Sequence, residues 1–277
     1  MFKSWITGRH VEKQRDAKAL YGVNDAKLGP DKVVYAIGDI HGMSVLALQL
    51  VQILLDDIER QAMPATIVVL GDMIDRGPDS RSVLDLFLNL EEKTHIPVKV
   101  TLLKGNHEQM MLDFMADPEQ HGPFWLRNGG GVTLMSYGLH PPSQLQNKQW
   151  VYIRDEFLQR LPPQHFDCFK QLLSKFIMGD YFFCHASVKA GQALSEQKDE
   201  DLLWSRSFPL DNGGSVEKII VHGHQPVVEP EMAKFHINID TGAYATGRLT
   251  ALRLHDSNRK FITVKAQKKA LPNKDDE

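Results

Sequence analysis

The 277-residue sequence contains only two cysteines, Cys168 and Cys184, which are too few for a disulfide framework and favour a reducing cytosol. No apolar run approaches the roughly 18 residues of a membrane-spanning helix, so we expect no membrane span. No apolar block follows the first basic residues, which argues against a signal peptide. The formal net charge is −3, which gives no indication of a nucleic-acid-binding surface. These absences predict a globular protein of the cytoplasm.

Short apolar runs alternate with segments of helical periodicity in the first 115 residues. The runs predict buried strands at 33–37, 66–70 and 97–103. The periodic segments predict helices at 44–60, from 79 or 80 to 90, and at 108–115. This alternation favours a parallel sheet with right-handed crossovers. Because the carboxyl ends of parallel strands share one edge, the turns that follow should lie together where such sheets bind ligands.

The rest of the chain is less regular. We expect a helical insertion or cap at 116–175, within a catalytic domain at 31–265, and helical structure from 150 to 176 except at Pro162 and Pro163. Residues 128–131 are interpreted as a plain turn, since neither a preceding strand nor a following Lys-Ser/Thr pair marks a phosphate loop.

Strand character returns at 180–185, 218–224, 235–240, 247–254 and 260–264. The last three segments alternate like half-buried antiparallel strands and suggest a second sheet packed on the first. Residues 1–30 are expected to be a polar extension, either a surface helix or a disordered lead-in, and residues 266–277 a frayed tail.

The turn after the second predicted strand carries unusual charge. Residues 71–77 place Asp72, Asp75 and Arg76 between two glycines at the mouth of a buried strand. Ordinary turns favour Asp and Gly, but they gain nothing from so many charges. We interpret Asp72 as a carboxylate that bridges two metal ions.

Other predicted strand ends supply similar groups. The set consists of three oxygen donors and three imidazoles: Asp39, His41, Asp72, Asn106, His185 and His224. Such donors without a thiolate suit Mn, Fe or Zn better than Ca. Six ligands suit two ions about 3.5–4 Å apart, as in two-metal phosphoester hydrolysis. One strand-end Asp or His alone would usually be a turn or core residue, so the joint pattern carries the prediction.

Five motifs carry a resemblance to a known family: residues 38–42, 71–77 and 105–108, His185, and Gly223-His224. They resemble the metallophosphoesterase (calcineurin-like) superfamily, most closely the phosphoprotein phosphatases in their short bacterial and phage-type form. The similarity runs from about Val33 to Leu254. It implies an α/β fold, a four-layer α/β/β/α sandwich of two mixed sheets flanked by helices. It also implies a di-metal centre, commonly loaded with Mn²⁺.

The resemblance also implies roles for individual residues. One metal would take Asp39, His41 and Asp72, and the other Asp72, Asn106, His185 and His224. His107 would be the general acid, with Asp75 holding its other ring nitrogen. Arg76 is suited to grip phosphate oxygens, and Arg206 resembles the second phosphate-binding arginine, although an exposed loop arginine is the alternative. Glu108 would either support the metal ligands through hydrogen bonds without binding the metal itself or lie at a helix N-terminus. Gly223-His-Gln-Pro226 lacks the second histidine of the wider superfamily's Gly-His-x-His, which fits the phosphoprotein phosphatase branch.

These features predict a metal-dependent phosphomonoesterase, with a protein serine/threonine phosphatase as the first choice. A metal-bridging hydroxide would attack phosphorus in line. The nearest alternative is a symmetric dinucleoside-tetraphosphate hydrolase, against which Asp75 and Glu108 argue. A broad-specificity or phosphotyrosine-directed phosphatase and a catalytically silent binding module are the others. The expected partner is a phosphorylated protein or a small phosphoester; the native metal (Mn²⁺, Fe or Zn) and the oligomeric state stay open.

Overall fold

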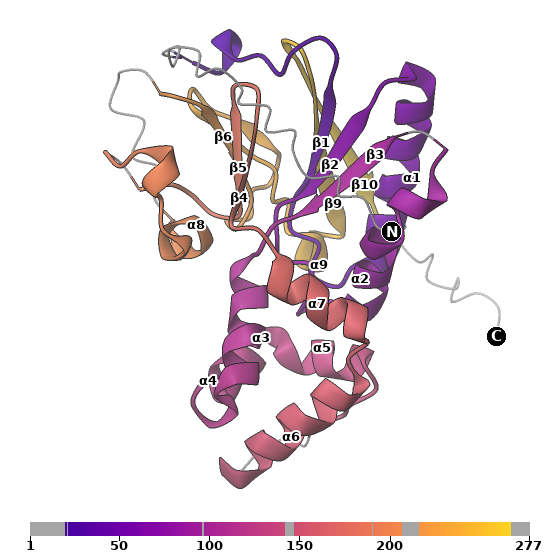
Figure 1. Cartoon of the computed structure of the whole chain (residues 1–277), viewed down its shortest axis with the longest axis vertical. Helices are drawn as coiled ribbons and strands as arrows, with labels where there is room; N and C mark the ends of the chain where they lie inside the picture. The colour runs from indigo at the N-terminus through magenta and orange to yellow at the C-terminus, as the bar shows by residue number, and fades with distance from the viewer. Residues whose placement is uncertain are drawn as a thin grey trace, which may run out of the picture.

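Two five-stranded sheets pack face to face in the computed structural model, and helices cover their outer faces (Figure 1). The structure describes residues 20, 22–95, 97–141, 147–189, 191–206 and 216–266. The expected α/β/β/α sandwich of two mixed sheets is confirmed. Of the predicted terminal segments, residues 1–19, 21 and 267–277 lie outside the described part of the chain.

The first sheet has the strand order β10-β9-β1-β2-β3. Its strands are β1 (Val33–Ile37), β2 (Ala65–Val69), β3 (Val98–Leu102), β9 (Arg248–His255) and β10 (Asn258–Lys265). β1, β2 and β3 are parallel, whereas β9 runs antiparallel to β1 and β10 antiparallel to β9. The prediction that 247–254 and 260–264 belong to a second sheet was therefore wrong. The alternation of a strand reports which faces are buried, not which sheet it joins. In β9, Leu249 and Ala251 pack in the cluster with α1 and α2, while Leu252 and Leu254 pack between the two sheets.

The second sheet has the order β4-β5-β6-β8-β7. Its strands are β4 (Lys175–Met178), β5 (Tyr181–Cys184), β6 (Ile219–His222), β7 (Glu231–Met232) and β8 (His236–Asn238). β5, β6 and β8 are parallel, with the antiparallel strands β4 and β7 at the edges. The prediction of helix up to residue 176 was wrong at its end. β4 pairs with β5 across a tight turn at Gly179, whose φ of +57° permits the reversal.

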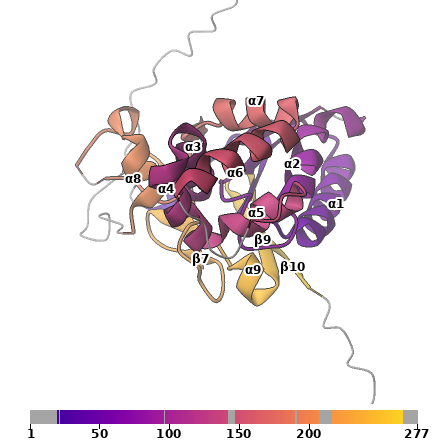
Figure 2. The same ribbon diagram turned by 90° about the horizontal axis from the view of Figure 1, so that it is seen from below.

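Helices cover both sheets and form a separate group beneath them (Figures 1 and 2). α1 (Ser44–Gln61) and α2 (Ser80–Leu88) pack on the first sheet, and α8 (Asp199–Trp204) packs on the second. The group beneath comprises α3 (Asn106–Ala116), α4 (Pro118–Trp125), α5 (Gly131–Ser136), α6 (Asn147–Arg160) and α7 (Pro163–Gln171). Shorter pieces are α9 (Ala243–Thr246), the 3₁₀ turns Val23–Asp25, Glu91–Lys93 and Leu194–Glu196, and a π-helical turn at Leu126–Gly130. Asp79 caps α2 by accepting a hydrogen bond from the Ser82 backbone, as its sequence position indicates.

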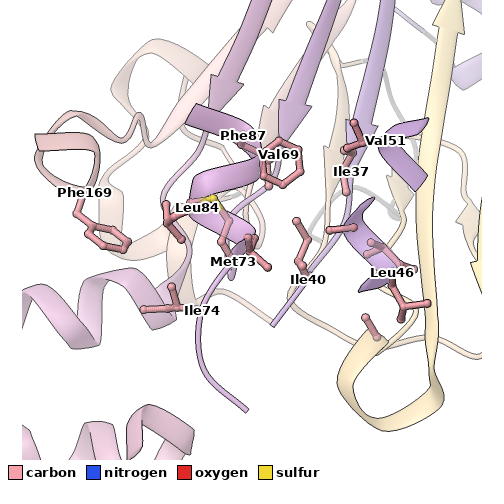
Figure 3. Packing of buried hydrophobic residues seen from close by; sticks show 14 of the residues in the cluster. Ile37, Ile40, Leu46, Val51, Val69, Met73, Ile74, Leu84, Phe87 and Phe169 are labelled. Carbon is pink, nitrogen blue, oxygen red and sulfur yellow. The ribbon is translucent and has the colours of Figure 1, made fainter. Parts of the chain in front are cut away.

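Alternating side chains of β1 enter two different cores. Tyr35 and Ile37 pack with α1 and α2, a cluster shown in part in Figure 3. Val34 and Ala36 face the other way, into a cluster between the sheets that includes Phe183. The same cluster takes in Leu20, Val23, Ala26 and Leu28. The described residues before Lys32 therefore pack into the inter-sheet core, earlier than the predicted start of the ordered chain.

Two sets of parallel strands end at one rim of the sandwich. β1, β2 and β3 end there in the first sheet, and β5, β6 and β8 in the second. No helix in the described part of the chain is long and apolar enough to cross a membrane. The rim is the place where turns from six strands meet.

Gly71 lets two of these turns touch. Its φ is +98°, and a Cβ added there would lie 2.4 Å from the backbone nitrogen of Gly105. Replacing Gly71 by alanine should therefore lower the free energy of unfolding by about 1–3 kcal/mol, measured by chemical denaturation. Gly29→Ala is the matched control, because Gly29 has a φ of +110° with nothing within 4 Å of the added Cβ. Equal losses in both variants would show that the backbone conformation alone, not the close approach, sets the cost.

Candidate active site

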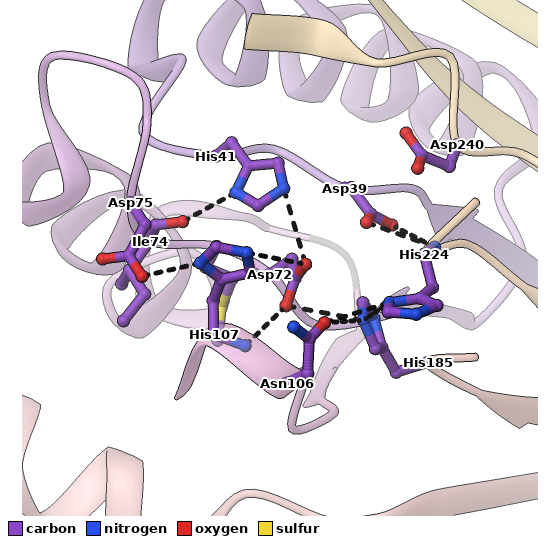
Figure 4. Close-up of polar contacts among 12 residues, drawn as sticks. Asp39, His41, Asp72, Ile74, Asp75, Asn106, His107, His185, His224 and Asp240 are labelled. Carbon is purple, nitrogen blue, oxygen red and sulfur yellow. Dashed lines mark hydrogen bonds and ion pairs between the residues drawn. The ribbon is translucent and has the colours of Figure 1, made fainter. Parts of the chain in front are cut away.

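All six predicted metal ligands meet at this rim (Figure 4). Asp39 and His41 follow β1, Asp72 follows β2, Asn106 begins α3, His185 follows β5 and His224 follows β6. The turns that carry them are strained, because non-glycine residues with a left-handed backbone cost about 1–3 kcal/mol each. These residues are His41, Asp72, Asp75, Arg76 and His224. Such strain persists where surrounding structure fixes it, as at a functional site.

Asp72 faces histidines from both sheets. Its Oδ2 lies 3.4 Å from His41 Nε2, and its Oδ1 lies 3.5 Å from His185 Nε2. The same Oδ1 accepts a hydrogen bond of 3.0 Å from the backbone N–H of His107. The two oxygens of one carboxylate thus point at two separate imidazoles. This is the arrangement that a carboxylate bridging two cations requires.

The tautomers of two histidines are set by backbone carbonyls. His41 Nδ1 donates to the Ile74 carbonyl at 2.9 Å, and His185 Nδ1 donates to the Leu70 carbonyl at 3.0 Å. Each Nε2 therefore turns a lone pair toward Asp72. Burial lowers the pKa of His41 to about 3 and also lowers the pKa of His185, so both rings are neutral. Neutral imidazoles oriented through their second nitrogen are typical of metal ligands.

Asn106 and His224 complete a second group around His185. His185 Nε2 lies 2.9 Å from Asn106 Oδ1 and 3.1 Å from His224 Nδ1. Two sets among the described residues are compact enough to hold a metal ion: Asp72, His185 and His224, and His41, Asp72 and His107. Asp39 lies beside them, where both carboxylate oxygens accept from the His224 backbone N–H at 3.2 Å. The structure thus brings His107, rather than Asp39, into the compact group with His41.

Buried carboxylates crowd this rim. Burial, with the charges of Asp240 and Asp72, raises the pKa of Asp39 well above its usual value. Burial likewise raises the pKa of Asp240 to about 7 and that of Glu108 to about 7. Carboxyl groups held this way need nearby positive charge to stay ionised, and divalent cations supply it. The donor set, its tautomers and its charge therefore fit two metal ions.

Asp240 was missed by the sequence analysis. It lies next to Asp39 in Figure 4 and is buried, and its Oδ1 accepts from the Gly242 backbone N–H at 2.8 Å. The signal was present, since Asp240 is the last residue of the strand predicted at 235–240 and comes just after β8 at the rim. The rule used for β1 and β2 finds it once β8 is known to run parallel to β6.

His107 and Asp75 form a buried pair. His107 Nδ1 donates to Asp75 Oδ2 at 2.7 Å, and both side chains are at most 1% exposed. Burial opposes the charge of His107, but Asp72 and Asp75 outweigh it and raise its pKa above the usual value. The ring is therefore held as a cation whose second nitrogen, Nε2, lies 4.0 Å from Asp72 Oδ2.

Both predicted phosphate-binding arginines are exposed near the site. The Arg76 guanidinium lies 4.7 Å above the Tyr244 ring, and that ring meets His41 edge-on at 5.2 Å. The positive charge of Arg206 is among the causes, after burial, that lower the pKa of His224 to about 3. Tyr244 was not predicted, because no motif spacing marks an aromatic side chain that comes from α9.

Glu108 ties two of the turns together. Its Oε2 accepts from the backbone N–H groups of Asp72 and Gly105, at 2.9 and 2.8 Å. Its Oε1 accepts from Met73 and Ile74, at 2.7 and 3.3 Å. A single buried carboxylate thus fixes the turn of Asp72 relative to the start of α3, which carries Asn106.

Glu108→Gln should weaken this clamp without changing its size. The new amide group would face backbone donors, so the free energy of unfolding should fall by about 1–3 kcal/mol. Metal affinity should fall by about 10–100-fold, as it does when a group behind a ligand is lost. Denaturation and metal titration measure both changes. Glu91→Gln is the control, because Glu91 accepts one backbone hydrogen bond, from Val100, away from the rim; equal effects would refute the clamp.

Residues 128–131, interpreted from the sequence as a plain turn, form part of two helical elements. They belong to the π-helical turn and the start of α5, and the Gly129 carbonyl accepts from the Arg76 backbone N–H at 3.4 Å. The contact spans more than 50 residues of chain, so local sequence gave no sign of it. The π-helical turn therefore touches the charged turn directly.

Comparisons with known proteins agree with this geometry. A sequence profile described as Calcineurin-like phosphoesterase matches residues 32–257. Serine/threonine-protein phosphatase 1 of Salmonella typhimurium is 30% identical over 227 residues, covering 80% of this chain and 91% of that protein. The asymmetrical bis(5'-nucleosyl)-tetraphosphatase PrpE of Anoxybacillus flavithermus is 27% identical over 231 residues, covering 78% and 88%.

Solved structures share the fold. A protein serine/threonine phosphatase from Saccharomyces cerevisiae matches with a TM-score of 0.51 and 14% identity, covering 90% of this chain and 87% of that one. A structure described provisionally as a diadenosine tetraphosphatase matches with a TM-score of 0.57 and 17% identity, covering 86% and 98%. The resemblance seen in the sequence motifs is confirmed: this chain belongs to the calcineurin-like phosphoesterase family and is a hydrolase.

Proposed function

We propose that this chain is a metal-dependent phosphomonoesterase that acts as a protein serine/threonine phosphatase. The observation that carries the proposal is the Asp72 carboxylate, which lies between two imidazole groups and next to the His107–Asp75 pair. Anion-binding arginines beside such a site suit a phosphoryl substrate. The 30% identity to a bacterial serine/threonine-protein phosphatase supports the choice of substrate.

Six residues would hold two divalent cations: Asp39, His41, Asp72, Asn106, His185 and His224. Asp72 would be shared, since its two oxygens face different histidines. When bound, the ions would neutralise phosphate charge as Lewis acids and activate water as a nucleophile. Carboxylate, amide and imidazole donors suit Mn²⁺ first, with Fe or Zn as alternatives.

The chain's own side chains would bind the phosphate and move the proton. Arg76 and Arg206 would each donate hydrogen bonds to phosphate oxygens and stabilise the charge of the transition state. Because Asp75 holds His107 Nδ1, the proton available to the leaving oxygen is the one on Nε2. Asp75 would keep the ring cationic and oriented until that transfer occurs.

Dinucleoside tetraphosphate hydrolysis is the second candidate. It is favoured by the 27% identity, across most of the chain, to proteins named asymmetrical bis(5'-nucleosyl)-tetraphosphatase. The sequence motifs suggested the symmetric enzyme as the rival, whereas these relatives carry the asymmetrical name. The two modes differ in products, since symmetric cleavage of diadenosine tetraphosphate gives two ADP and asymmetrical cleavage gives ATP and AMP.

A panel of substrates tests the proposal. Metal-stripped protein is reloaded with Mn²⁺, Fe²⁺ or Zn²⁺ and assayed on phosphoserine, phosphothreonine and phosphotyrosine peptides and on diadenosine tetraphosphate. We expect the highest kcat/KM on the first two peptides with Mn²⁺. A higher value on the dinucleotide would replace the proposal with the second candidate, and a preference for phosphotyrosine would redirect it. No turnover with any metal would indicate a binding module.

We also propose a cytoplasmic location. Cys168 and Cys184 are both free thiols. Free cysteines with no disulfide between them are typical of a reducing compartment. Cell fractionation with an antibody against the chain would place it directly.

A further inference from the structure

Asp75 receives three side-chain hydrogen bonds, and two of them come from the helical insertion. Trp125 Nε1 donates to Asp75 Oδ2 at 2.9 Å, the same oxygen that accepts from His107 at 2.7 Å. Thr133 Oγ1 donates to the other oxygen, Oδ1, at 2.6 Å. All four side chains are buried. Both carboxylate oxygens of Asp75 are thus held by hydrogen bonds, and rotation of the group would break bonds at both.

The direction of the hydroxyl network follows from these contacts. Because Thr133 gives its proton to Asp75 Oδ1, the hydrogen bond of 3.0 Å between Ser80 Oγ and Thr133 Oγ1 must be donated by Ser80. The Asp75 backbone N–H is shared between two acceptors, Thr133 Oγ1 at 2.9 Å and Ser80 Oγ at 3.1 Å. The network closes on Asp75 with each hydroxyl proton used once.

The indole of Trp125 is seated by its own surroundings. Its ring lies 4.8 Å from the Phe114 ring and 6.1 Å from the Phe157 ring. Gly130 packs directly on it, since an added Cβ would approach Trp125 Cε2 to 2.4 Å. Neighbouring Gly129 meets the backbone of Arg76 in the same way, with its added Cβ at 2.9 Å from the Arg76 nitrogen. The π-helical turn thus packs closely against both the Trp125 indole and the turn that carries Arg76.

We propose that Trp125 and Thr133 are positioning residues that act through Asp75 on His107. The insertion at 116–175 would then do more than cover the site, because it would set the orientation of the general acid. The inference rests on the proposed function, in which His107 protonates the leaving oxygen. Sequence alone separates Trp125 and Asp75 by 50 residues, so no motif connects them.

A positioning role predicts an effect that depends on the leaving group. An alkoxide such as the serine side chain is a poor leaving group and needs the proton, whereas p-nitrophenolate leaves without it. Damage to metal binding or to the fold would slow both substrates equally. A misplaced acid slows only the substrate that needs the acid.

The test compares Trp125→Phe and Thr133→Val with the wild-type chain, all loaded with the same metal. On a phosphoserine peptide, each variant should lower kcat about tenfold, part of the about 10²–10⁴-fold that a general acid contributes, with KM unchanged. On p-nitrophenyl phosphate the change should stay below about twofold. Thr133→Ser keeps the hydroxyl and should restore the peptide rate.

Trp150→Phe is the matched control. Trp150 is a second buried tryptophan of the insertion, on α6, where it packs against Gly122 instead of the rim. Trp150→Phe should leave the ratio of kcat on the phosphoserine peptide to kcat on p-nitrophenyl phosphate as it is in the wild-type chain. The Nδ1 proton of His107, observed by NMR in metal-free protein and assigned by its absence in His107→Asn, should shift in both Trp125→Phe and Thr133→Val.

The outcomes separate the two levels of the proposal. No wild-type turnover of any phosphopeptide would overturn the proposed function itself. Wild-type turnover with equal losses on both substrates, or with no loss, would overturn the positioning role and leave the phosphatase intact. If Trp125→Phe fails to fold by circular dichroism, Thr133→Val with its Thr133→Ser counterpart decides the inference alone.

Discussion

Asp72→Asn should abolish turnover and remove bound metal together. We expect kcat to fall by more than the about 10²–10³-fold that losing one charge-stabilising group costs. Metal analysis should find the content drop from two ions per chain to one or none. The change is nearly isosteric, so it removes charge and one oxygen ligand while keeping the shape of the turn.

The expected size of this effect follows from the place of Asp72. One oxygen faces His41 and the other faces His185, so a single substitution alters both candidate metal groups. An amide can present only one oxygen, and its nitrogen would point a donor at one of the two ions. Losing a residue that hydrogen-bonds a metal ligand lowers metal affinity by about 10–100-fold. Losing the ligand itself should lower metal affinity by more than that.

Asp57→Asn is the control for this variant. Asp57 is also a mostly buried carboxylate, and it lies away from the rim. Its Oδ2 accepts hydrogen bonds from Arg253 Nε, at 2.8 Å, and from the Tyr35 hydroxyl. Its loss should lower stability and leave metal content and kcat unchanged. If Asp72→Asn retained full metal occupancy, the assignment of Asp72 as the bridging ligand would be refuted.

The sequence allowed the rim to be predicted because strand ends carry a local signal. An apolar run that ends in a polar or imidazole side chain marks β1, β2, β3, β5 and β6 without any knowledge of pairing, and a glycine directly precedes that side chain after every one of these strands except β5. Parallel order in each sheet then places these ends together. Asp39, His41, Asp72, Asn106, His185 and His224 converge for that reason.

Strand partners were harder to predict, because alternation reports which face is buried and not what lies beside the strand. β9 and β10 have the pattern of half-buried hairpin strands, and they joined the first sheet through β1 instead of forming a second one. β4 was taken for the end of a helix because four residues are too few to separate the two periods.

Contacts across long stretches of chain gave no sequence signal at all. Trp125, Thr133 and Tyr244 reach the site from α4, α5 and α9, and each reads locally as an ordinary core or surface residue. Their chemistry appears only once the turn of Asp75 and Arg76 is in place beside them. The strand-end rule finds the candidate ligands, whereas the side chains that donate to Asp75 come from α4 and α5, far from it in the sequence.

His107→Asn should lower kcat by about 10²–10⁴-fold with both metal ions still bound. Asparagine offers no proton to the leaving oxygen at neutral pH, and it removes one hydrogen bond to Asp75 Oδ2. Trp125 and Thr133 still donate to Asp75, so the buried carboxylate keeps partners and the turn should hold its shape. The loss should be larger on a phosphoserine peptide than on p-nitrophenyl phosphate, since only the former needs the proton.

His165→Asn is the control for the loss of a buried histidine. His165 is fully buried between Tyr137, whose hydroxyl lies 2.8 Å from Nδ1, and Asp85, whose carboxylate lies 3.0 Å from Nε2. It takes no part in the rim. This variant should lower the midpoint of thermal unfolding while kcat and its dependence on the leaving group stay as in the wild-type chain.

Metal analysis of His107→Asn decides between the two roles that geometry allows. His107 Nε2 is close enough to His41 and Asp72 to share an ion with them, so a ligand role and an acid role both fit the distances. Its Nδ1 is bonded to a buried carboxylate that keeps the ring cationic, and a protonated imidazole cannot bind a metal. The acid role therefore predicts full metal content with slow turnover. Loss of one ion with the substitution would make His107 a ligand, and unchanged turnover would remove it from the chemistry.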